Sequence, residues 1–114
     1  MDLLKRPATP GTVGCLDVLA QIGQEIRSGR PLWMFTGDST AQSLFAFIQG
    51  FQAALALNEI EDAGYRRFLV WARDEKGAIP PEGWVKKFLE GASGDHAVAI
   101  GRFLDLVTEF LPMR

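Results

Sequence analysis

The sequence is poor in residues that build metal or redox chemistry. Among 114 residues there is one cysteine, Cys15, and one histidine, His96. A single cysteine excludes a disulfide within the chain, and a metal site needs several nitrogen, sulfur or carboxylate ligands that converge. We therefore predict no metal and no cofactor. Cys15 is interpreted as a small buried residue and His96 as an exposed residue in the first turn of the last helix.

The sequence also lacks a block of positive charge. The formal net charge is -2, and lysine and arginine occur as separate pairs along the chain. A surface that follows a phosphate backbone is normally a basic stripe with a pI above about 9, whereas the pI here is near 5.3. Nucleic acid is therefore not expected as a partner. The lone cysteine and the absence of a signal-peptide pattern favour a cytoplasmic location.

A transmembrane segment is not expected either. Residues 39–58 carry no charge, and a membrane-spanning helix needs about 20 mainly apolar residues. At 100° per residue, however, Gln42, Gln49 and Gln52 fall on one stripe, opposite a face of leucine, isoleucine and phenylalanine. Residues 39–58 therefore read as an amphipathic core helix, and no membrane is expected as a partner.

Length and patterning indicate one all-α domain. The chain is long enough for a single core, and no segment alternates polar and apolar residues between turn signals. Residues 1–11 hold two prolines and show no period, so they are expected to form a flexible N-terminal arm. Residues 12–111 are expected to form a single helical domain, a compact bundle of four or five helices around the long central helix at about 39–58.

The other expected helices follow from caps and breakers. One runs from about 12 to 28, capped by Thr12 and stopped by Gly29. The connector 30–37 is apolar, and we expect it to be extended. Asp38 or Ser39 is expected to cap the central helix. A third helix follows the acidic turn 59–62, a short one covers about 82–90, and the last begins near Asp95.

The tripeptide Gly37-Asp38-Ser39 resembles the block that carries the nucleophilic serine of GDS-type esterases. A serine nucleophile needs a base and an oxyanion hole. Those enzymes resemble one another in an Asp-x-x-His near the C-terminus, whereas His96 here directly follows Asp95. Asp38 and Ser39 are better explained as N-cap residues of the following helix. A small hydrolase using Ser39 is kept only as a remote alternative.

Aromatic, arginine and acidic residues outside the expected core are candidates for binding a partner. Tryptophans in so small a domain are more often core, as is expected for Trp71 and Trp84, and Trp33, beside Arg30 in the connector, is the best candidate of the three for partial exposure. Acidic turns steer encounters with basic partners. The predicted partner-binding residues are Arg30, Trp33, Phe35, Glu59, Glu61 and Asp62.

The connector and the central helix together resemble a family of small bacterial proteins. The members share an Arg-Pro-x-Met-Tyr-x-Gly stretch before a helix reading Leu-x-x-Phe-Leu-x-Gly-Tyr. The matching residues here are Arg30-Pro31, Trp33, Met34, Gly37, Leu44, Phe47-Ile48, Gly50-Phe51 and Ala54, with Phe68, Trp71, Trp84, Phe103, Leu106 and Phe110 downstream. The spacing to Gly37 is one residue longer than in the family, and Phe51 replaces the usual tyrosine.

Some members of that family resemble the immunity partners encoded beside bacterial polymorphic toxins. The resemblance implies a non-enzymatic protein that occludes a toxin domain, and it carries over no catalytic residue. The leading hypothesis is therefore that the chain is a protein-binding module, and more specifically an immunity-type inhibitor. The alternative is a small regulatory or scaffold protein that forms a homo-oligomer through Trp33 and Phe35.

Overall fold

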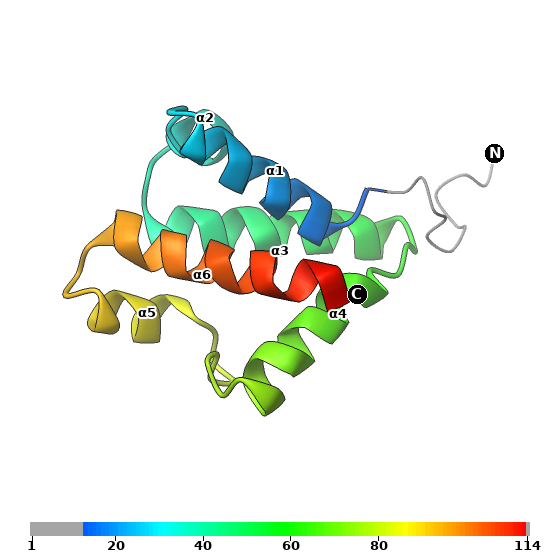
Figure 1. Cartoon of the computed structure of the whole chain (residues 1–114). Helices are drawn as coiled ribbons and strands as arrows, with labels where there is room; N and C mark the ends of the chain where they lie inside the picture. The colour runs from blue at the N-terminus through cyan, green and yellow to red at the C-terminus, as the bar shows by residue number, and fades with distance from the viewer. Residues whose placement is uncertain (1–12, 114) are drawn as a thin grey trace.

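The computed structural model describes residues 13–113, and within that range the prediction of an all-α fold is confirmed (Figure 1). The predicted N-terminal arm and the Thr12 cap lie outside the described residues. The helices are α1 (Cys15–Arg27), α2 (Trp33–Thr36), α3 (Ala41–Leu57), α4 (Ala63–Val70), α5 (Val85–Gly91) and α6 (His96–Phe110). A π-helical turn, Trp71–Glu75, continues α4, and a 3-10 turn, Leu111–Met113, follows α6.

Helix α6 supplies the largest share of the buried side chains. It packs against α1, α3 and α5, and Figure 1 shows it running alongside α3, with α1 on one side and α5 on the other. Its buried residues include Ala99, Phe103, Leu106, Val107 and Phe110, the face expected from the sequence. Helix α3 is the longest, and its fully buried residues are Ala41, Leu44 and Ile48.

The amphipathic interpretation of α3 agrees with the structure for most of the helix: Gln42 and Gln49 are exposed, and Phe47 and Phe51 are half-buried against the core. Gln52, which was expected on the same polar stripe, is instead half-buried, and its amide donates to the Asp62 carboxylate at 3.0 Å. No helix within residues 13–113 is long and apolar enough to cross a membrane.

The start of α3 differs from the expected start by two residues. Thr40, rather than Asp38 or Ser39, is the N-cap, and its hydroxyl accepts a hydrogen bond from the Ser43 N–H at 3.1 Å. The Asp38 carboxylate instead accepts from the Thr40 N–H at 3.0 Å and from the Thr40 hydroxyl at 2.7 Å. Asp38 therefore supports the capping residue Thr40, while the Thr40 hydroxyl makes the capping hydrogen bond itself.

The centre of the molecule is aromatic. Phe68 on α4 contacts Phe103 and Phe110 on α6, with ring centroids 6.0 Å and 5.7 Å away. Trp84 stacks on Phe103 at 4.2 Å, and Trp71 lies 5.3 Å from Phe110. Both tryptophans are buried, as expected from the sequence.

Candidate functional site

The connector between α1 and α3 forms an exposed apolar surface. It was expected to be extended, and this prediction is wrong for residues 33–36, which form the single helical turn α2. The Pro31 and Leu32 carbonyls accept hydrogen bonds from the N–H groups of Met34 at 3.2 Å and Phe35 at 2.8 Å. The fixed φ of Pro31 favours a helix start, and Gly37, at φ 87°, ends the turn.

One turn of helix has room to bury only part of its side chains. Leu32, just before α2, is buried, so it anchors the turn to the core. Trp33, Met34 and Phe35 are 56%, 54% and 36% exposed, and we call these three residues the α2 surface. Trp33 is thus exposed, although burial in the core was the general expectation for tryptophans in so small a domain. Met34 was not among the predicted partner-binding residues. The sequence did contain a signal for its exposure, because a connector this short cannot bury three consecutive large apolar residues.

Arg30 lies next to this turn and is held in place. Its guanidinium pairs with the carboxylate of Glu25 on α1. The hydrogen bond from Arg30 lowers the pKa of Glu25, so the pair stays charged at neutral pH. Arg30 remains largely exposed. Its backbone N–H donates to the Glu25 carbonyl at 2.9 Å, and this hydrogen bond holds the chain where it leaves the C-terminal end of α1 through Gly29.

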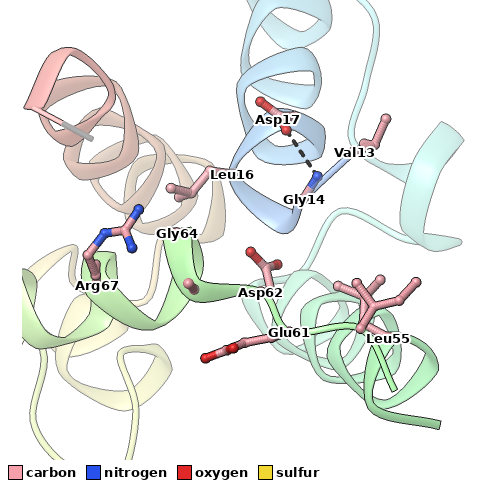
Figure 2. Close-up of a pocket in the computed structure, with 11 residues that line it drawn as sticks. Val13, Gly14, Leu16, Asp17, Leu55, Glu61, Asp62, Gly64 and Arg67 are labelled. Atoms are coloured by element: carbon pink, nitrogen blue, oxygen red, sulfur yellow. Dashed lines mark hydrogen bonds between the residues drawn. The ribbon is translucent and has the colours of Figure 1, made fainter. Parts of the chain in front are cut away.

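The predicted acidic residues occupy the turn between α3 and α4, and they differ in orientation. Glu59 and Glu61 are exposed, and Glu61 forms an ion pair with Arg66. Asp62 instead turns inward: in Figure 2 its carboxylate points toward the first turn of α1. Glu59 and Glu61 are therefore available to a partner, whereas Asp62 is engaged within the fold.

Asp62 joins the beginnings of two helices. Its Oδ1 accepts from the Tyr65 N–H at 3.3 Å, which caps α4. Its Oδ2 accepts from the Cys15 N–H at 2.9 Å, at the start of α1, and from the Gln52 amide at 3.0 Å. Beside it lies a pocket of about 240 Å³, which Asp17, Glu61 and Arg67 also line (Figure 2). The positive ends of two helix dipoles meet at this carboxylate.

The two groups of predicted site residues are not brought together. The α2 surface precedes α3 and the acidic turn follows it, and Figure 1 shows them at opposite ends of that helix. At 1.5 Å per residue, the 17 residues of α3 separate them by about 25 Å. They are two surfaces rather than one site.

Glu59 adopts a conformation that favours glycine. Its φ is 56°, and it follows the last turn of α3, where the Ile60 N–H donates to the Leu55 carbonyl at 2.9 Å. A side chain in the left-handed region costs about 1–2 kcal/mol, and a carboxylate opposes the helix dipole at this end. Ser93, at φ 55°, occupies the equivalent position after α5.

We expect Glu59→Gly to raise the free energy of unfolding by about 1 kcal/mol, because glycine relieves the strained φ. Ser93→Gly is the matched variant and is expected to give a gain of similar size. Glu59→Ala removes the charge and keeps the strain, so its gain is expected to be smaller. Urea denaturation followed by circular dichroism measures all three. A loss of stability in Glu59→Gly contradicts the argument.

Cys15 is fully buried, in agreement with its interpretation as a small apolar residue. Burial first, and then the charge of Asp62, raise the pKa of its thiol from 9.0 to about 12. Burial likewise raises the pKa of Tyr65. Thiolate is the nucleophilic form of cysteine, so Cys15 is unreactive in the folded protein at neutral pH.

This raised pKa predicts a loss of stability in alkaline solution. Above pH 9 the unfolded chain releases the Cys15 proton while the folded chain keeps it, so unfolding is favoured as the pH rises. The slope is about 1.4 kcal/mol per pH unit for one proton. By pH 10.5, wild type is expected to lose about 2 kcal/mol more than Cys15→Ala, each relative to its own value at pH 8. Parallel pH profiles for the two proteins exclude this explanation.

Ser39 and His96 lie on either side of the start of α3 and have different surroundings. Ser39 is exposed before α3, and no hydrogen bond joins it to His96 within residues 13–113. His96 was expected to be exposed, but it is half-buried: its Nδ1 accepts from the Ala41 N–H at 2.9 Å. His96 thus satisfies a donor at the start of α3, because the first turns of α3 and α6 lie together.

The described part of the chain contains no group of three histidine, cysteine or acidic residues placed to hold a metal ion. No protein-family model, curated protein or solved structure matches this chain.

Proposed function

We propose that this chain is a non-enzymatic protein-binding module whose contact with its partner is centred on the α2 surface. The observation that carries the proposal is the exposure of Trp33, Met34 and Phe35, three consecutive large apolar side chains, on a turn that the buried Leu32 anchors to the core. Tryptophan, phenylalanine, methionine and arginine are enriched at protein interfaces, and Arg30 adjoins the turn.

The turn supports this role because it is held before any partner arrives. Leu32 is buried, and the N–H groups of Phe35 and Gly37 donate to the carbonyls of Leu32 and Trp33 at 2.8 Å and 2.9 Å. A preformed surface loses less conformational entropy on binding, so more of the apolar contact contributes to affinity. The hydrogen-bonded backbone thus presents the three apolar side chains on one preformed turn.

We further propose that the partner is a toxin domain and that this chain is its cytoplasmic, immunity-type inhibitor. The resemblance of residues 30–110 to a family with immunity-like members supports this partner. Inhibition would be steric, with the acidic residues Glu59 and Glu61 as a second contact for a basic region. A standard interface of about 800 Å² per partner is about 30 Å across, which is close to the length of α3.

Co-expression of the chain with each adjacent reading frame tests the proposal. The expected result is rescue of growth from one toxic product and recovery of a stable complex. Trp33→Ala is expected to weaken that complex about 30-fold, the effect of removing an interface residue worth about 2 kcal/mol. Val70→Ala, at an exposed apolar residue of α4, is the matched control and is expected to leave affinity unchanged. Full rescue by Trp33→Ala with unchanged affinity rejects the α2 surface.

A homo-oligomer through the same surface is the second candidate. Trp33 and Phe35 are exposed as such a contact requires. The area is small, however: about half of three large side chains amounts to about 300 Å², well below the 800 Å² per partner of a stable interface. Light scattering distinguishes self-association from binding to a different protein. A dimer mass for wild type that falls to the monomer mass in Trp33→Ala favours self-association.

A further inference from the structure

A groove of about 340 Å³ lies between α5 and α6, and we call it the α5–α6 groove. Its apolar lining consists of Phe88 of α5, Leu106 of α6 and Ala78 of the loop before α5. Leu106 is buried, and the other two side chains are half-buried. The two helices pack on each other, so the groove is a formed part of the folded domain.

Lys87 and Arg102 supply the charged part of the groove lining. The Lys87 ammonium donates to the Gly77 carbonyl at 3.0 Å. The Arg102 guanidinium donates to the Gly91 carbonyl at 2.9 Å, and a Cβ on Gly91 would lie only 3.4 Å from it. Both cations are thus tethered to the backbone, but within residues 13–113 neither of them forms an ion pair.

The groove suits a segment in which an apolar side chain lies close to a carboxylate. None of the described residues that line it is acidic, so its two positive charges are not neutralised locally. The chain as a whole carries a net charge of -2, which makes this surface an exception. Complementary charge selects a partner and fixes its orientation, while the apolar lining provides contact area.

The end of α3 carries a segment of this kind. Leu57, its last residue, is 85% exposed, more than any other large apolar residue that the structure describes. Glu59 is exposed two residues later and has no ion pair within residues 13–113. We call Leu57 and Glu59 the α3 tip. Neither residue helps the fold, because Leu57 buries little surface and Glu59 has a strained φ of 56°.

The α3 tip and the α5–α6 groove lie apart in one molecule. Helix α5 packs beside Phe45, in the first half of α3. Leu57 lies about 18 Å further along α3, at 1.5 Å per residue. Figure 1 shows α5 near the start of α3 and the turn after α3 at its other end. A contact between the tip and the groove therefore joins two different copies.

We propose that the α5–α6 groove binds the α3 tip of a second copy of this chain. The Leu57 side chain packs on the apolar lining, and the Glu59 carboxylate pairs with a cation of the groove. Each copy offers one tip and one groove, so copies join head to tail. The contact is far smaller than the 800 Å² per partner of a stable interface, so we expect a dissociation constant of about 0.1–1 mM. It uses neither the α2 surface nor a toxin partner.

Two single-site variants, studied alone and mixed, test the proposal. Leu57→Ser removes the tip and keeps the groove, whereas Lys87→Glu reverses a charge in the groove and keeps the tip. In sedimentation velocity, wild type is expected to gain mass as its concentration rises to the millimolar range, while each variant alone stays monomeric. Their equimolar mixture is expected to form a heterodimer and nothing larger, because one intact tip then meets one intact groove.

Two further variants are the controls. Trp33→Ala is expected to associate like wild type, since the α2 surface takes no part. Glu59→Ala is expected to weaken association about twofold to fivefold, the effect of one exposed ion pair, although the same change is expected to stabilise the fold. Circular dichroism confirms that every variant is folded. The proposal is overturned if wild type stays monomeric at millimolar concentration, if the mixed variants do not associate, or if Trp33→Ala abolishes association.

Discussion

Replacing Phe68 with alanine is expected to lower the free energy of unfolding by about 3–5 kcal/mol. Phe68 is fully buried and is the side chain through which α4 contacts α6. Its ring centroid lies 5.8 Å from that of Tyr65 and 6.2 Å from that of Trp71, in addition to the two phenylalanine rings on α6. Removing it leaves a cavity that rings on two different helices have to close, and relaxation is therefore incomplete.

Urea denaturation followed by circular dichroism measures this loss. Because a domain of this size is stable by about 5–15 kcal/mol, Phe68→Ala is expected to be folded only marginally. Phe68→Leu keeps most of the volume, and we expect it to lose about 1–2 kcal/mol and give a complete unfolding curve. Val70→Ala, two residues along the same chain segment and exposed, is the control and is expected to change stability by less than about 0.5 kcal/mol. A loss below about 1 kcal/mol in Phe68→Ala contradicts the central position given to this residue.

Helical periodicity predicted the elements whose structure depends on local sequence. The apolar face of α6 and the stop at Gly29 are as expected, because both follow from spacing within a few residues. Burial of Trp71 and Trp84 was also expected, since large aromatic residues in a small domain are mostly core. The long helix α3 was recognised from its stripe of glutamine.

Contacts between residues far apart in the chain were not predictable in this way. Asp62 bonds to Cys15, 47 residues earlier, and His96 bonds to Ala41, 55 residues earlier. Both side chains were interpreted as exposed from their local patterns, and only the packing of α1 on α4 and of α3 on α6 determines their partners. The one-turn helix α2 was missed for a related reason, because the burial of Leu32 holds a turn too short to be stable alone.

Asp62→Ala is expected to lower the free energy of unfolding by about 2–4 kcal/mol. Loss of an N-cap side chain typically costs about 0.5–2 kcal/mol, and this carboxylate satisfies the first turns of both α1 and α4. The substitution also leaves the Gln52 amide without its acceptor in a partly buried position. Asp62→Asn keeps one oxygen and is expected to lose less than alanine does, since it can still accept from one of the two helices.

Glu61→Ala separates this structural role from the general effect of removing a negative charge at the same turn. Glu61 is the adjacent acidic residue, but its ion pair with Arg66 is exposed, and such pairs contribute about 0–1 kcal/mol. Hydrogen exchange gives the local readout: in Asp62→Ala the Cys15 and Tyr65 amides are expected to exchange faster, while in Glu61→Ala they keep the wild-type rate. If both substitutions cost less than about 1 kcal/mol, Asp62 is not the junction of the two helices. If Asp62→Ala alone is destabilising, any loss of partner binding in that variant follows from the fold, and Glu59 and Glu61 remain the acidic residues available for contact.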